Sequence, residues 1–89
     1  MTKEEYLLEL VDLQKEDTSR AIESGFTSKK EWFEFIRTQE HDEIAEAIID
    51  LAVRAELPPG KVASHFDQSM VWRVMSRQET EKSIRKKAA

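Results

Sequence analysis

Residues 42–60 read DEIAEAIIDLAVRAELPPG and contain the most regular pattern in the chain. Apolar residues recur there at three- and four-residue spacing, and acidic residues fall almost diametrically opposite, which is typical of an amphipathic helix. The proline pair at 58–59 ends the pattern, because a residue that precedes proline is pushed out of the helical region. We therefore predict a helix over residues 42–56. Its apolar face comprises Ile44, Ile48, Leu51, Ala52 and Ala55, and its acidic stripe comprises Glu43, Glu46 and Asp50.

Two helix-start signals precede this segment. Residues 2–5 (TKEE) and 28–31 (SKKE) have the form of a capping box, in which a hydroxyl and a carboxylate satisfy free backbone amides. Asp17 and Thr18 either cap a second short helix or continue the first, and Gly25 ends it. We expect helices over about 3–14, 17–24 and 28–37. The first carries one apolar stripe, made of Tyr6, Leu7, Leu10, Val11 and Leu13.

The segment after Lys61 presents a conflict between apolar and charged residues. An unbroken helix would place Arg73 and Arg77 in the apolar face that contains Met70, which is costly for charged groups. A break at residues 67–69 removes the conflict and places the two arginines away from the apolar side. We therefore predict helices over 61–67 and 69–83, followed by a basic tail, 84–89, that frays. The apolar side of the second would comprise Val71, Val74 and Met75.

Length and composition indicate a single small domain over residues 1–83. The chain has 89 residues, of which only two are glycine and two are proline, which is few for a β-rich fold. It contains no cysteine, and no apolar run approaches the ~20 residues of a membrane span. The acidic N-terminus lacks the apolar segment of a secretion signal. We expect an all-α protein, a small bundle of four to five short helices, located in the cytoplasm.

Charge is divided unevenly along the chain. Residues 1–56 contain seven Lys/Arg and fifteen Asp/Glu, a net of −8, whereas residues 57–89 contain seven against three, a net of +4. This division suits an acidic surface for a basic partner and a basic C-terminal part for an acidic partner or nucleic acid. A second copy of the chain is a further possible partner, which would make a homodimer.

Residue patterns for catalysis are missing from the sequence. His41 and His65 fall in no metal-ligand spacing, and there is neither a glycine-rich phosphate loop nor a nucleophilic serine motif. One acidic pattern is superficially similar to all-helical nucleotide pyrophosphohydrolases, which hold magnesium, but its spacing departs from their E-x-x-D. We therefore expect no enzyme activity, no cofactor and no metal. The acidic pattern comprises Glu31, Glu34, Glu43, Glu46 and Asp50.

Two patches of the sequence resemble a known family. The first runs Thr2-Lys3, Tyr6-Leu7-x-x-Leu10-x-x-x-Gln14-x-x-Asp17-Thr18 and Ile22-Glu23, and the second is Ser69-x-Val71-Trp72-Arg73; Phe35 and His41 lie between them. They are similar to the Hha/YmoA family, small helical bacterial proteins that modulate gene expression by binding the nucleoid-structuring protein H-NS. The chain departs from the family in extra residues around 58–60 and in its basic tail. The resemblance implies a regulator that binds a nucleoid-associated DNA-binding protein through charged helix faces.

Two other functions fit parts of the sequence. Residues 59–78 can form a degenerate helix-turn-helix, with a short turn at 67–69, that contacts DNA directly. Alternatively, the acidic N-terminal part can cover a basic surface of a target, as an inhibitor or antitoxin-like protein does. In the helix-turn-helix interpretation, the residues that meet phosphates or base edges are Arg73, Arg77, Gln78 and Lys82.

Trp72 distinguishes these interpretations most clearly. It lies off the stripe formed by Val71, Val74 and Met75, so we expect it to be partly exposed and to belong to an interface. The candidate partner-binding residues are therefore Trp72, Arg73, Arg77, Glu43, Glu46 and Asp50.

Overall fold

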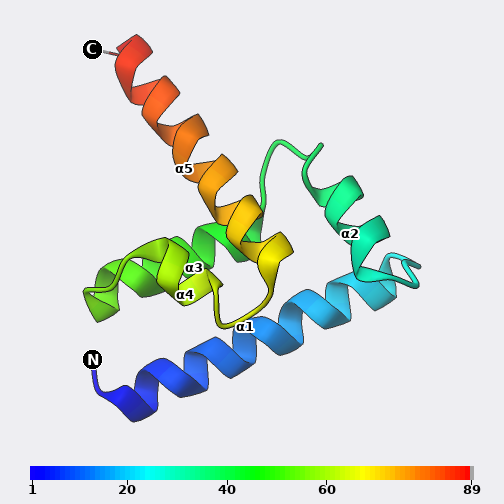
Figure 1. Ribbon diagram of the computed structural model, residues 1–89, viewed down its shortest axis with the longest axis horizontal. Coiled ribbons are helices and arrows are strands. Elements are labelled where there is room, and N and C mark those ends of the chain that lie inside the picture. Colours follow the sequence, from blue (N-terminus) through cyan, green and yellow to red (C-terminus); the bar gives the residue numbers. More distant parts are fainter. Residues whose placement is uncertain (89) are drawn as a thin grey trace.

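The chain folds into five helices, as a computed structural model shows for residues 1–88, with side chains described for residues 1–79. The all-α bundle predicted from the sequence is confirmed, and the described residues form no strand. Helices α3, α4 and α5 contact one another, and α1 packs against α3 along one edge of the molecule (Figure 1). The helices are α1 (Lys3–Glu23), α2 (Lys29–Ile36), α3 (Glu43–Ala55), α4 (Pro59–Ala63) and α5 (Gln68–Ala88).

Helix α1 is continuous, so of the two alternatives at Asp17 and Thr18 the continuation of the first helix is confirmed, and the division into helices over 3–14 and 17–24 is wrong. Thr18 does not cap a new helix, because its hydroxyl donates to the carbonyl of Gln14 at 3.0 Å within α1. The predicted ends are confirmed. Thr2 accepts from the amide of Glu5 at 3.1 Å, and the chain leaves the helix through Gly25 with a φ of +85°.

The hydrophobic core lies between α3 and its neighbours α1, α4 and α5. The predicted apolar face of α3 is buried at Ile44, Ile48, Leu51 and Ala52 and meets Leu10 of α1. Burying a side chain of this size stabilises the fold by roughly 1.5–3 kcal/mol. Of the stripe predicted on α1, Leu10 is buried and Tyr6 and Leu13 pack partly against the core, whereas Leu7 and Val11 are exposed.

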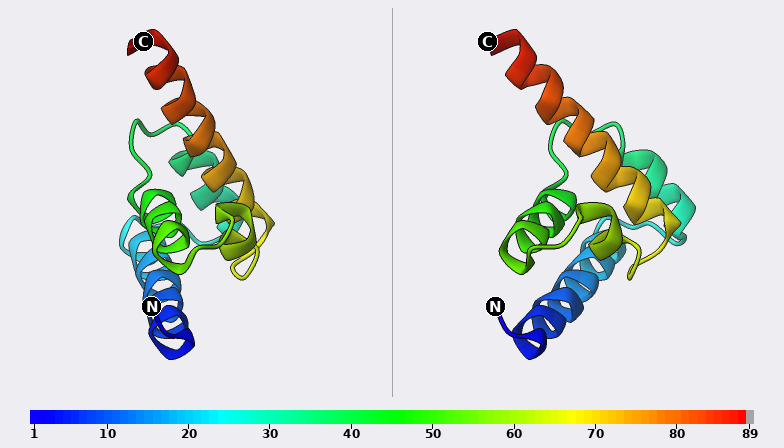
Figure 2. Two further views of the ribbon diagram at one scale, coloured as in Figure 1. Left: turned by 90° about the vertical axis from the view of Figure 1, so that its left-hand side faces the viewer. Right: turned by 60° about the vertical axis from the view of Figure 1, so that its left-hand side comes forward.

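The predicted break between the last two helices is confirmed at Asp67. Its carboxylate caps α5 by accepting from the amide of Met70 at 3.0 Å and from the hydroxyl of Ser69 at 2.6 Å. Helix α4 is shorter than the predicted 61–67 and begins at Pro59, which suits a first helical turn because it has no amide to leave unpaired. The backbone of α5 continues past the predicted end at 83 to Ala88 (Figures 1 and 2).

The orientation of α5 about its axis differs from the prediction. We expected Val71, Val74 and Met75 to face the core and the arginines to face away. The expectation holds for Val74, which is buried, and for Val71, which packs partly against the core, but Met75 is exposed and Arg73 is buried beside Met70. The break therefore did not remove arginine from the apolar side, and Arg73 lies inside the fold. Two carboxylates from distant parts of the chain offset the cost of its burial.

Candidate functional site

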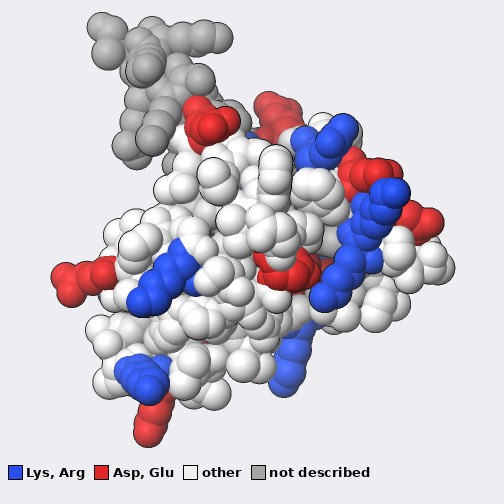
Figure 3. Space-filling view, in the orientation of Figure 1, with Lys and Arg blue, Asp and Glu red and all other residues white. Residues whose placement is uncertain are grey.

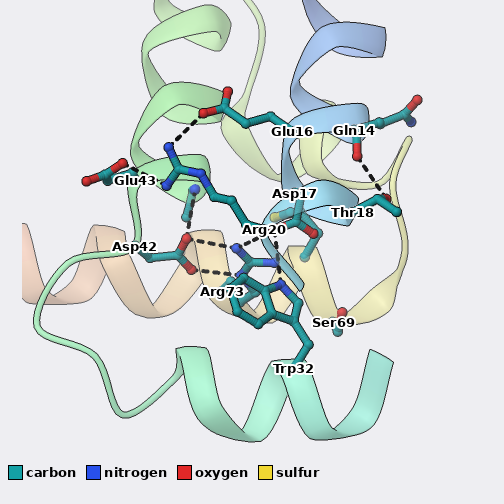
Figure 4. Close-up of polar contacts among 12 residues, drawn as sticks. Gln14, Glu16, Asp17, Thr18, Arg20, Trp32, Asp42, Glu43, Ser69 and Arg73 are labelled. Atoms are coloured by element: carbon teal, nitrogen blue, oxygen red, sulfur yellow. Dashed lines mark hydrogen bonds and ion pairs between the residues drawn. The ribbon is translucent and has the colours of Figure 1, made fainter. Parts of the chain in front are cut away.

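Arg73 lies at the centre of a cluster of side chains inside the fold (Figure 4). We call it the Arg73 cluster, and it comprises the charged groups of Asp17, Asp42 and Arg73 and the indole of Trp32. Its Nε and Nη2 donate to the two carboxylate oxygens of Asp42 at 2.7 and 2.8 Å. Nη2 also lies 3.0 Å from Oδ1 of Asp17. Such bidentate pairing, together with a second carboxylate, is what a guanidinium needs when it leaves water.

Trp32 attaches α2 to this cluster. Its indole Nε1 donates to Oδ1 of Asp17 at 3.1 Å, and the guanidinium of Arg73 lies 5.9 Å from the centre of its ring. Phe35 stacks on the same indole and Phe26 packs against it with a tilted ring, with ring centres 5.8 and 5.6 Å away. Side chains from α1, α2, α5 and the start of α3 therefore meet at one point.

Asp42 has two roles in this arrangement. It is the N-cap of α3, because its Oδ1 accepts from the amide of Ala45 at 3.1 Å, and it also binds Arg73. Burial acts to lower the pKa of Arg73, but hydrogen bonds and the charges of Asp42 and Asp17 outweigh it and raise the pKa. Arg73 therefore stays charged inside the protein, and the surface position that we predicted for it is wrong.

Arg77 is also held by neighbouring groups. Its Nη1 donates to the carbonyl of Glu40 at 2.7 Å, and its Nη2 lies 2.6 Å from a carboxylate oxygen of Glu46. The same Nη2 is 3.4 Å from Nδ1 of His41. The Arg77 side chain is partly buried, and its two terminal nitrogens bind the segment between α2 and α3 and Glu46 of α3, so little of it is available to a phosphate or a partner.

The acidic stripe of α3 faces solvent, and each of its members has a basic partner. Glu43 lies 2.7 Å from Arg20, Glu46 lies 2.6 Å from Arg77, and Asp50 lies 3.0 Å from Arg54. These ion pairs neutralise the stripe locally. In the part of the chain with described side chains, no three His, Asp or Glu residues converge as metal ligands, so the magnesium pattern is not assembled there.

Trp72 and Met75 point away from the core on the outer side of α5. Trp72 is 59% exposed and Met75 is 54% exposed, as the sequence led us to expect for the tryptophan. Beside Trp72 lies a groove of about 180 Å³ between α2 and α5, the α2–α5 groove. Its walls include Phe33, Ile36 and Arg37 from α2 and its C-terminus, and Trp72, Ser76 and Arg77 from α5.

The wall contributed by α2 was missed in the sequence. Phe33 and Ile36 share the apolar side of a short helix, and nothing local indicates that this side leaves a groove beside α5. The sequence identified Asp17 only as a possible helix cap and Asp42 only as the start of a helix, because their contacts with Arg73 span long separations in sequence. Gln78 is partly buried, and the side chain of Lys82 lies outside the described residues.

The face of the molecule seen in Figure 3 has scattered charges rather than one large patch of a single sign. None of the described helices combines the length and apolar character that crossing a bilayer requires. Comparisons of the chain with protein-family models, curated proteins and solved structures found no match. The resemblance to the Hha/YmoA family therefore stays a prediction.

Proposed function

We propose that the chain is a non-enzymatic regulatory protein that binds a protein partner at the α2–α5 groove, with Trp72 as the anchor. The observation that carries the proposal is the exposure of Trp72, 59%, beside a groove whose walls combine the apolar Phe33 and Ile36 with polar and charged side chains. Tryptophan is among the residues that contribute most to protein interfaces, and burying it removes a large apolar area from water. Small pockets beside such anchors receive side chains of the partner.

The chemistry of the groove indicates what the partner presents. Phe33, Ile36 and Trp72 offer apolar contacts, while Arg73 and Asp42 at the base satisfy each other. Arg37 is exposed and forms no ion pair within the part of the chain with described side chains. An amphipathic helix with apolar residues and a carboxylate placed to meet Arg37 would complement these groups.

The finer form of the proposal is a cytoplasmic modulator of gene expression, whose partner is a nucleoid-associated DNA-binding protein. The likeness of two sequence patches to the Hha/YmoA family supports it. Trp72, which belongs to the second patch, is exposed, whereas Arg73 beside it is buried. We therefore propose Arg37, rather than Arg73, as the charged residue that contacts the partner.

Direct DNA binding is a second candidate because α3, α4 and α5 contact one another pairwise, as the helices of helix-turn-helix domains do. In that case α5 would enter the major groove. The exposed positions of its described part present Gln68, Trp72, Met75, Ser76 and Glu79, with no cation among them. Phosphate contacts would then come from exposed cations outside the described part of α5, such as Arg37 or Lys61, or from basic residues beyond 79, such as Lys82.

A capture experiment with the tagged protein in lysate separates the two candidates. We expect the wild-type protein to capture a protein partner that nuclease treatment does not release. The Trp72→Ser variant should fail to capture that partner. Val53→Ser is the matched control, because Val53 is 69% exposed on α3, outside the groove lining. Circular dichroism checks that both variants stay helical.

One outcome would contradict partner binding: the protein retards DNA directly in a gel shift, in a salt-sensitive manner, and the Trp72→Ser variant retards it equally. Loss of that retardation with Lys61→Glu or Lys82→Glu would then support the helix-turn-helix function. Release of a captured protein by nuclease would mean that nucleic acid bridges the two. Either result would remove the α2–α5 groove from the proposed function.

A further inference from the structure

Helix α1 has a second apolar group of residues, and it faces away from the core. Leu8 and Ile22 are 67% and 68% exposed, and Val11 is also exposed. The opposite side of α1 carries Leu10 and the other residues that pack on the core. In Figures 1 and 2, α1 runs along the edge of the molecule and no other element covers its outer side.

The outer residues of α1 follow the spacing of a helix–helix seam. Glu4, Leu8, Val11 and Lys15 are separated by four, three and four residues, the alternation that brings side chains onto one line in paired helices. Two apolar positions lie at the middle of this seam, and a charge of opposite sign lies at each end. Neither Glu4 nor Lys15 forms an ion pair within the part of the chain with described side chains.

We infer that a second copy of this chain binds the outer face of α1, with the two α1 helices antiparallel. A two-fold axis at the level of residues 9 and 10 brings Leu8 of one copy opposite Val11 of the other. The same axis brings Glu4 opposite Lys15. Each of these pairs occurs twice, because the contact between identical copies is symmetric.

Charge selects this arrangement over a parallel one. Parallel helices would place Glu4 beside Glu4 and Lys15 beside Lys15, and like charges across a helix seam repel. In the antiparallel arrangement every charged position of the seam meets the opposite sign. The apolar contact involves only one helix from each copy, so the dimer forms reversibly and depends on concentration.

The dimer would leave the α2–α5 groove open in both copies, because the outer face of α1 points away from α3 and α5 (Figure 1). A partner with two suitable segments would then bind the pair more tightly than a single copy. The inference itself does not require the proposed function. It concerns the association of the chain alone and is tested with purified protein.

Sedimentation velocity over a range of concentrations tests the dimer. We expect wild-type protein to shift from monomer to dimer as concentration rises, and Leu8→Glu to raise the dissociation constant at least ten-fold. Val53→Glu is the matched control, since it places the same charge on an exposed apolar position of α3. Wild-type protein that stays monomeric at all concentrations, or a Leu8→Glu variant that dimerises normally, would overturn the inference.

Charge reversal identifies the occupant as a second copy in this orientation. Glu4→Lys and Lys15→Glu should each weaken the dimer, and the double variant should restore it, with circular dichroism confirming that α1 stays helical. The chain has no cysteine, so Leu8→Cys protein mixed with Val11→Cys protein should form disulfide-linked heterodimers. Failure of the double variant to restore association, or preferential cross-linking of Leu8→Cys to itself, would contradict the antiparallel seam.

Discussion

Arg73 and Trp72 are neighbours in the chain, yet the arginine is 5% exposed and the tryptophan 59% exposed. Most proteins place these residue types the other way round, because burying a charge is costly and exposing an aromatic ring forgoes hydrophobic stabilisation. One helix, α5, therefore carries a charge on its inner face and a large apolar side chain on its outer face. The comparison teaches that polar contacts help to orient α5, which buries Met70 and Val74 together with Arg73 and leaves Trp72 at the surface.

The two residues contribute to the protein in different ways. The buried ion cluster adds little net stability, because its attraction mainly repays the cost of removing charges from water. It does fix how α1, α2, α3 and α5 meet, since only one orientation of α5 brings Arg73 to both Asp17 and Asp42. Trp72 makes no comparable contribution to the fold, and its exposure is the main support for the proposed partner site.

The largest effect is expected from Arg73→Met, which leaves two buried carboxylates without their cation. Removing one partner from such a cluster costs roughly 3–5 kcal/mol, so the free energy of unfolding from urea denaturation should fall by that amount. Arg54→Met is the control, because its pairs with Glu9 and Asp50 lie at the surface. Equal, small losses in the two variants would show that Arg73 does not orient α5.

A smaller effect is expected from Arg77→Met, one turn further along the same helix. This change removes a charged hydrogen bond to the carbonyl of Glu40 and the pair with Glu46, but the site is half-buried and water can replace part of the loss. The free energy of unfolding should fall by roughly 1.5 kcal/mol. If Arg77→Met lowered the free energy of unfolding as much as Arg73→Met, Arg77 would contribute to stability in the same way as the Arg73 cluster.

The free energy of unfolding should depend on pH through Asp67, the residue that caps the start of α5. Burial acts to raise the pKa of Asp67, but hydrogen bonds from Ser69, Met70 and Lys29 outweigh it and hold the pKa below its ordinary value. A carboxyl whose pKa is lowered by folding stabilises the fold above its unfolded pKa, and this stabilisation disappears as pH falls through the folded pKa.

Because the Asp67 side chain is about a third exposed, its contribution should be less than about 1 kcal/mol. Urea denaturation at neutral and acidic pH measures it. Asp67→Asn should remove the corresponding part of the pH dependence while its stability in acid stays near that of wild type. An unchanged pH profile in that variant would assign the dependence to other carboxylates.

The smallest effect on stability is expected from Trp72→Ser. Exposed positions away from caps and buried networks usually change the free energy of unfolding by no more than about 0.5 kcal/mol. The same variant should lose the protein partner, which a pull-down measures. A loss of about 2 kcal/mol or more would mean that Trp72 packs into the fold, and the contrast with Arg73 would fail.

The sequence by itself determined the features that depend on a few adjacent residues. The capping residues Thr2, Ser28 and Asp42 begin helices where predicted, the prolines at 58–59 follow the end of α3, and Asp67 separates α4 from α5. Caps, prolines and helical periodicity act over a single turn, so their effects are visible in short windows. The exposure of Trp72 was predicted for the same reason, from its position off one apolar stripe.

The inward face of α3 followed from the sequence, but in α1 and α5 only the tertiary structure decided which side chains pack inward. In α5 the sequence favoured Val71, Val74 and Met75, but Arg73 is buried because Asp42, 31 residues away, and Asp17 supply opposite charges. In α1 the core accepts Leu10 and leaves Leu7 and Val11 exposed. The α2–α5 groove likewise exists only once two distant helices are placed. These features depend on partners far apart in the sequence, which local patterns of charge and hydrophobicity do not specify.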